Sequence, residues 1–181
     1  MKKNVFVLAV TLMLVLAAIL PALADGTITL TGQPRSIAPQ NFTFVGVTLG
    51  GADQLDRLGS TTGWIATDPT GTGDGWKVTI AADAPTNVGG KTIPLSGFEI
   101  TLLDTNINVT GGDGLGTNTK PLSAADSSVL TLGSAQTLVS ANANLGMGTY
   151  VMTPTLSLDI PAATYAGIYT TTLTVTIAAI P

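Results

Sequence analysis

The sequence predicts an all-β fold, a single β-sandwich of about eight mainly antiparallel strands. Residues Ala166–Ile177 alternate between apolar and hydroxyl side chains with a period of two, which is typical of a half-buried strand. The chain is rich in threonine, whose β-branched side chain favours extended backbone, and strong helix formers rarely follow one another. Gly-, Asn- and Pro-rich turns separate the apolar runs.

The first 24 residues are predicted to be a secretory signal peptide. Lys2 and Lys3 precede the apolar run Val5–Leu20, and Ala22-Leu23-Ala24 offers small residues for cleavage before Asp25. A retained membrane anchor is the alternative, but a spanning helix needs about 20 apolar residues and this run is shorter. We therefore expect an exported product with one domain over residues 25–181 and no membrane span after cleavage.

The candidate strands are short apolar or alternating runs bounded by turn residues. In chain order they are Thr27–Thr31, Phe42–Leu49, Trp64–Thr67, Trp76–Ala81, Gly97–Leu103, Ser128–Leu132, Thr137–Ala141, Tyr150–Ile160 and the closing strand within Ala166–Ile177.

Four segments need separate comment. The strands at Trp64–Thr67 and Trp76–Ala81 flank a Gly/Asp-rich connection and predict a hairpin. Pro154 indicates a sheet edge or a bulge within its strand. Ala52–Leu58 is the one place where a short helix could form, and residues 111–120 are expected to be a flexible loop.

Composition excludes several classes of function. The chain has no cysteine and no histidine, so disulfides, zinc thiolate sites and serine–histidine or cysteine–histidine catalysis are all excluded. The net charge of −4 and the absence of a basic cluster make nucleic acid an unsuitable partner. We expect no enzyme activity, no cofactor and no metal site.

The loop acids Asp68, Asp74, Asp104 and Asp113 do not change this expectation. Calcium prefers loop oxygens of this kind, but their spacing matches no strong calcium loop, and turns favour aspartate in any case. A carboxylate pair for glycoside cleavage is also missing, because Glu99, which lies in a predicted strand, has no obvious partner.

Two segments carry a family resemblance. Residues Asp68–Ile80 read as an acidic, Gly-rich turn that leads into Trp76-Lys77-Val78, and Ala166–Ile177 forms the closing strand. This arrangement resembles the WxL family of Gram-positive surface domains, over a span from about Phe42 to Pro181. Val78 stands where the family usually has leucine, and Val175 stands where the second motif has tryptophan.

The resemblance implies non-covalent attachment to the cell wall through peptidoglycan, and assembly with other exported surface proteins. The candidate binding residues are Trp64, Trp76, Lys77 and Val78. If both motif tryptophans were needed to hold the wall, the valine at position 175 would weaken binding or abolish it.

Each tryptophan has two interpretations. Trp76 shares a strand face with Val78 and Ile80, which favours a core position over an exposed ligand platform. Trp64 and Ile65 point in opposite directions. Trp64 therefore either packs beneath Ala52–Leu58 or offers an exposed ring to a sugar.

Two functions follow from these observations. The first is a secreted cell-surface module that binds peptidoglycan, another cell-wall polymer or a wall-bound partner protein. The alternative is a structural subunit that self-assembles into a surface layer or fibre, with its regular terminal strands pairing edge to edge.

Overall fold

The computed structural model describes residues 28–113, 122–123 and 130–180. The chain divides into two compact units, Met1–Leu30 and Thr31–Pro181. The predicted signal peptide lies outside the described residues, so its cleavage stays a prediction. The second unit is built almost entirely of antiparallel strands, which confirms the predicted all-β sandwich.

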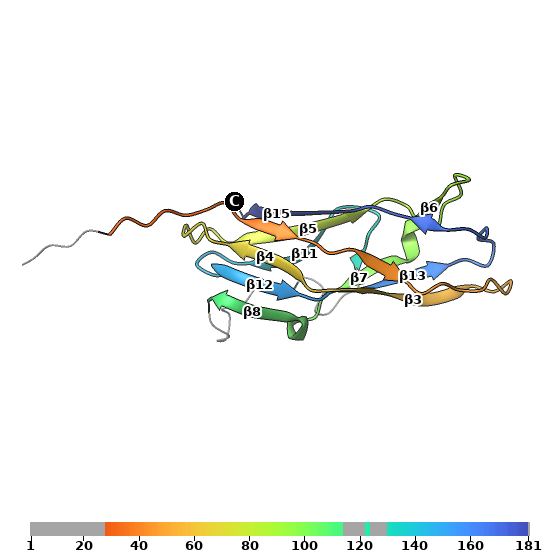
Figure 1. Cartoon of the computed structure of the whole chain (residues 1–181), viewed down its shortest axis with the longest axis horizontal. Coiled ribbons are helices and arrows are strands. Elements are labelled where there is room, and N and C mark those ends of the chain that lie inside the picture. The colour runs from red at the N-terminus through yellow and green to blue at the C-terminus, as the bar shows by residue number, and fades with distance from the viewer. Residues whose placement is uncertain (1–27, 114–121, 124–129, 181) are drawn as a thin grey trace, which may run out of the picture. The chain divides into compact units, whose positions relative to one another are not determined.

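Two of the sheets are built from the same four stretches of chain. Each stretch contributes one strand to each sheet, and the order of the stretches is the same in both. The first sheet has the order β1 (Ser36–Ala38), β4 (Trp64–Asp68), β12 (Gly148–Met152) and β8 (Ile107–Gly112). The second sheet has the order β10 (Leu130–Thr131), β7 (Phe98–Thr101), β13 (Thr155–Ile160), β3 (Gln54–Thr61) and β2 (Phe42–Phe44). Each of the four stretches leaves one sheet and continues in the other, so the sheets lie end to end (Figure 1).

The breaks between these sheets have local causes. Pro154 has no backbone N–H to donate and falls between β12 and β13. Gly63 separates β3 from β4, and a Cβ atom there would lie 2.5 Å from the Val151 side chain. The 3₁₀ turn η2 (Asp104–Asn106) separates β7 from β8.

A third sheet covers the first. Its order is β15 (Leu173–Ala179), β5 (Trp76–Ala82), β11 (Gln136–Ala141) and β9 (Leu122–Ser123). The rings of Trp76 on β5 and Tyr150 on β12 are 5.7 Å apart, so the two sheets pack face to face. A two-stranded ribbon of β6 (Thr86–Asn87) and β14 (Tyr169–Thr170) and the 3₁₀ turn η1 (Leu95–Gly97) complete the unit.

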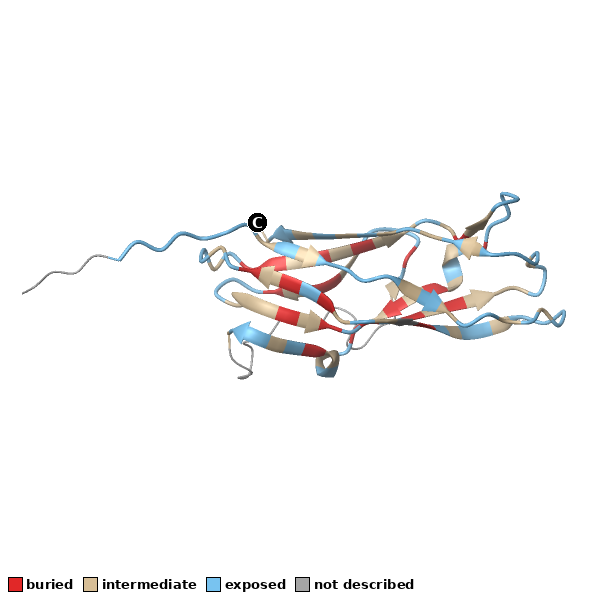
Figure 2. Cartoon of the chain, in the orientation of Figure 1, coloured by how far each residue is buried: buried red, intermediate tan, exposed pale blue. Residues whose placement is uncertain are grey.

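One continuous apolar core runs beneath the sheets. Buried positions alternate along β4, β5, β7, β12 and β13, as Figure 2 shows by colour. Along β11 the alternation breaks at a bulge, and Leu138 and Val139 are both buried there. In the strand predicted at Gly97–Leu103, the alternate residues Phe98, Ile100 and Leu102 are all fully buried.

Several expectations from the sequence are wrong. The strands predicted at Tyr150–Ile160 and Ala166–Ile177 are each divided into two strands of different sheets, β12 and β13 in the first case and β14 and β15 in the second. Ile28–Thr31 forms no strand, and the strand predicted to run from Phe42 to Leu49 ends at Phe44. Within Ala52–Leu58, where a short helix could form, residues 54–58 belong instead to β3, because their backbone pairs in the second sheet between β13 and β2. β4 and β5 form no hairpin, since the connection between them crosses from the first sheet to the third.

Other predicted segments fall partly outside the described residues. The strand at Ser128–Leu132 corresponds to β10, and residues 128–129 are not described. Of the loop at 111–120, Gly111 and Gly112 end β8, and residues 114–120 are not described. Within the described ranges, no helix has the length and hydropathy needed to cross a membrane.

Candidate functional site

The two motif segments lie side by side. β5 carries Trp76-Lys77-Val78, β15 carries Val175-Thr176-Ile177, and the two strands pair in antiparallel register. The register places Ile177 opposite Val78 and Val175 opposite Ile80. These segments are about a hundred residues apart in the chain, yet they form one surface in the third sheet.

Trp76 is a core residue. Its ring is fully buried, and its Nε1–H donates a hydrogen bond to the Gly146 carbonyl at 2.8 Å. This confirms the core interpretation of Trp76, because the ring offers no face to solvent.

Steric constraints require glycine at position 75, immediately before Trp76. Gly75 has a φ of +72°, and a Cβ atom there would lie 2.4 Å from the Ala141 carbonyl oxygen. Only glycine combines this backbone conformation with so close an approach. The Gly-Trp order of the motif is therefore required for the chain to enter β5.

Asp68 holds the turn that precedes the motif. Its carboxylate is buried and lies 3.3 Å from the Arg35 guanidinium. It also accepts hydrogen bonds from the hydroxyl of Thr70, at 2.6 Å, and from the backbone N–H of Thr70, at 3.1 Å. The Thr70 contacts close the turn and the Arg35 contact joins it to the segment before β1, which assigns Asp68 a structural role.

The outward face of the third sheet carries a row of hydroxyl groups. Thr79 on β5 and Thr176 on β15 face each other, with their hydroxyl oxygens 2.6 Å apart. Thr137, directly opposite Thr79 on β11, extends this row. We call Lys77, Thr79, Thr137 and Thr176 the hydroxyl face.

Lys77 is the cation of this face. It is partly exposed, lies opposite Ser140 of β11 and Ala178 of β15, and forms no ion pair with any described residue. Val78, the next residue, is fully buried on the opposite side of the sheet. Of the four predicted binding residues, Lys77 is therefore the one whose side chain solvent can reach.

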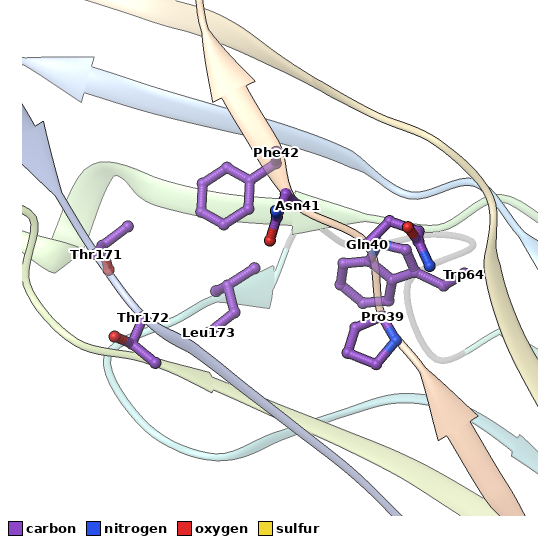
Figure 3. Close-up of a pocket in the computed structure, with 8 residues that line it drawn as sticks. All are labelled: Pro39, Gln40, Asn41, Phe42, Trp64, Thr171, Thr172 and Leu173. Carbon is purple, nitrogen blue, oxygen red and sulfur yellow. The ribbon is translucent and has the colours of Figure 1, made fainter.

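Trp64 lies beside a separate cavity of about 230 Å³ (Figure 3). Its lining comes from the segment between β1 and β2, from Trp64 and from the start of β15: Pro39, Gln40, Asn41, Phe42, Trp64, Thr171, Thr172 and Leu173.

Trp64 itself is fully buried, and its Nε1–H donates to the Thr61 hydroxyl at 3.1 Å. The exposed-ring interpretation of Trp64 is therefore wrong. The cause is that β4 turns this ring toward the core and leaves Ile65 on the outer side. A binding role for Trp64, Trp76, Lys77 and Val78 stays a prediction.

A buried tyrosine lies behind the motif. The Tyr150 hydroxyl has no hydrogen-bond partner among the described residues. Burial, with smaller contributions from the negative charges of Asp113 and Asp68, raises the pKa of Tyr150 from 10.0 to about 12. The phenol is therefore neutral throughout the physiological range.

The described residues offer little for chemistry. They contain no group of three or more acidic side chains placed to hold a metal ion. Two of the loop acids have structural partners, since Asp113 accepts a hydrogen bond from the Met147 backbone N–H at 2.9 Å and Asp68 pairs with Arg35. The arrangement is suited to presenting a surface.

Arg35 and Gly146 are the residues that sequence reasoning missed. Arg35 lies 33 positions before its partner Asp68, and Gly146 lies 70 positions after Trp76. No local pattern marks either residue, because both contacts depend on how distant strands pair.

A protein-family model described as "WxL domain surface cell wall-binding" matches residues 59–181. The matched range begins near the end of β3 and includes both motif strands. Comparison with curated proteins and with solved structures gives no match.

Proposed function

This chain belongs to the WxL family of surface cell wall-binding domains, and from that premise we propose that it is an exported, non-catalytic module of the Gram-positive cell wall. It attaches without a covalent bond to peptidoglycan, to another wall polymer or to a wall-bound partner protein. The family match over residues 59–181 is the observation that carries this proposal. Removal of residues 1–24 as a signal peptide would deliver the domain of residues 25–181 to the cell surface.

The contact surface of this proposal is the hydroxyl face. Its threonine hydroxyls both donate and accept hydrogen bonds, as recognition of a polyhydroxylated glycan requires. Lys77 adds one positive charge in a chain of net charge −4, and wall polymers carry carboxylate or phosphate groups. The buried rings of Trp64 and Trp76 contribute indirectly, because both belong to the apolar core on which the first and third sheets pack.

Sedimentation with isolated cell walls tests the proposal. The purified chain beginning at Asp25 should pellet with walls and should be released by salt or denaturant. Walls stripped of protein distinguish the ligands: retained binding identifies the wall polymer, and lost binding identifies a protein partner. A chain that stays in the supernatant with intact walls of its own host contradicts the proposal.

A further inference from the structure

An apolar groove lies in the second sheet's half of the domain, and its lining contains no residue of β5 or β15. Its volume is about 770 Å³, and its lining includes Phe44, Val47, Leu49, Leu158 and Ile160. Its outer walls expose large apolar side chains, since Val45 is 81% exposed and Ile168 is 83% exposed. The groove is independent of the hydroxyl face and of the cavity at Trp64.

The backbone along one wall of the groove has no partner among the described residues. Residues 45–50 follow β2 and belong to no strand. Their backbone groups make no hydrogen bond with the backbone of any described residue. Unpaired backbone beside an apolar surface is the template on which an added β-strand docks. An extended segment with two apolar side chains on one face would satisfy both the backbone and the groove lining.

The chain itself carries a segment of that description. Thr27-Ile28-Thr29-Leu30-Thr31 alternates perfectly between threonine and an apolar residue, and its sequence predicts a strand. Residues 28–31 nevertheless form no strand, and Ile28 and Leu30 are 81% and 85% exposed. The segment has the pattern of a strand and lacks a sheet.

Chain length prevents this segment from filling the groove of its own domain. The backbone N–H of Gln33 is hydrogen-bonded to the Pro69 carbonyl at 3.0 Å, and residues 28–31 can extend at most about 18 Å from that anchor.

The groove lies farther from the anchor than this. Ser36, opposite Thr67, and Phe44, opposite Gly59, are eight residues apart along two strands and their short connection, about 26 Å at the rise of a β-strand. In Figure 1 the strands β4 and β3, with which these two strands pair, lie toward opposite ends of the sheets.

We propose that the groove accepts the Ile28–Thr31 segment of a second copy of this chain as an added strand. Ile28 and Leu30 then face the groove lining, and the strand backbone pairs with residues 45–49. The contact is head to tail, because a segment near the start of one copy meets the far end of the next. Contacts of this kind form a closed assembly where the rotation between copies closes, and an open chain of molecules where it does not.

Size-exclusion chromatography with light scattering of the chain beginning at Asp25 provides the first test. The particle mass should rise with concentration. Leu30→Asp should weaken association at least about tenfold, since it removes one buried apolar side chain from the contact. Thr29→Asp, on the other face of the segment, and Val88→Asp, an exposed apolar position outside the groove, should leave association unchanged.

Cysteine cross-linking provides the second test, because the chain has no cysteine of its own. A mixture of the Leu30→Cys and Val47→Cys variants should form a disulfide-linked dimer under mild oxidation. Leu30→Cys mixed with Thr137→Cys, on the hydroxyl face, should not.

A chain that remains a monomer at all concentrations overturns the proposal, as does association that Leu30→Asp leaves intact. The same holds if the Leu30→Cys and Val47→Cys pair forms no cross-link. Wall sedimentation is a separate readout, because the Leu30→Asp monomer keeps its hydroxyl face. Self-assembly and wall attachment can therefore fail independently.

Discussion

Ile177 lies directly opposite Val78 in the antiparallel pairing of β15 with β5. The last residues of the triplets Trp76-Lys77-Val78 and Val175-Thr176-Ile177 therefore lie opposite each other, whereas the first residues of the two triplets do not. Val175 lies opposite Ile80, and Trp76 lies opposite Ala179. A tryptophan at position 175 would be displaced along the strands from Trp76 by four residues, about 13 Å. Valine at this position thus leaves the packing around Trp76 unchanged.

Loss of the Trp76 ring should strongly destabilise the domain. Trp76→Ala removes a fully buried ring that contacts Tyr150, and should lower the free energy of unfolding by about 3–5 kcal/mol. Trp76→Phe keeps a ring but leaves the Gly146 carbonyl without its donor, and should cost about 1–3 kcal/mol. Denaturant unfolding measures both changes, and an unchanged midpoint for Trp76→Ala contradicts the core assignment.

Replacing Asp68 should destabilise the domain more than replacing Asp74 nearby, because the Asp68 carboxylate is buried. Asp68→Ala leaves the Arg35 guanidinium without its ion pair and opens the Thr70 turn, and should cost about 2–4 kcal/mol. Asp74→Ala is the matched control, since Asp74 is exposed and should change stability by less than about 0.5 kcal/mol. Equal effects of the two variants would contradict this structural role for Asp68.

Stability should fall at high pH because of Tyr150. Its pKa is raised to about 12 in the folded chain from 10.0, so the folded state binds more protons than the unfolded state between these values. The stabilisation is complete below pH 10 and is lost as the pH rises toward 12, by about 3 kcal/mol in all.

Tyr150→Phe provides the control for this titration. The variant should lose the tyrosine's share of the pH dependence of stability. At neutral pH it should be about 1 kcal/mol more stable, because the hydroxyl it removes is buried without a partner among the described residues. Denaturant unfolding of both chains at a series of pH values tests this, and parallel stability curves would disprove it.

Wall attachment should depend on Lys77 in particular. Lys77→Gln removes the cation of the hydroxyl face and should weaken wall binding about threefold to tenfold, with a smaller dependence on salt. Lys91→Gln removes the same charge from a residue that stacks over the Tyr165 ring, 4.6 Å from its centroid, and should have little effect on binding. Wall sedimentation at two salt concentrations compares them, and equal losses would indicate a non-specific charge effect.

Local alternation determined the class of fold and much of the strand content. The pattern of Trp76, Val78 and Ile80 identified one face of β5 as core, and the pattern in Ala166–Ile177 indicated a closing strand, whose residues 173–177 lie in β15. The absence of histidine and cysteine excluded whole classes of chemistry by composition alone. These conclusions hold because strand periodicity and side-chain chemistry are properties of neighbouring residues.

Only the tertiary structure decided which strands are neighbours. It separated β4 from β5, brought β5 and β15 into register, joined Arg35 to Asp68, and turned the ring of Trp64 inward. It also left Ile28–Thr31 without a sheet, although that segment has the composition of a strand. The physical reason is that pairing depends on contacts between residues far apart in the chain, and a strand's own alternation does not identify its partner.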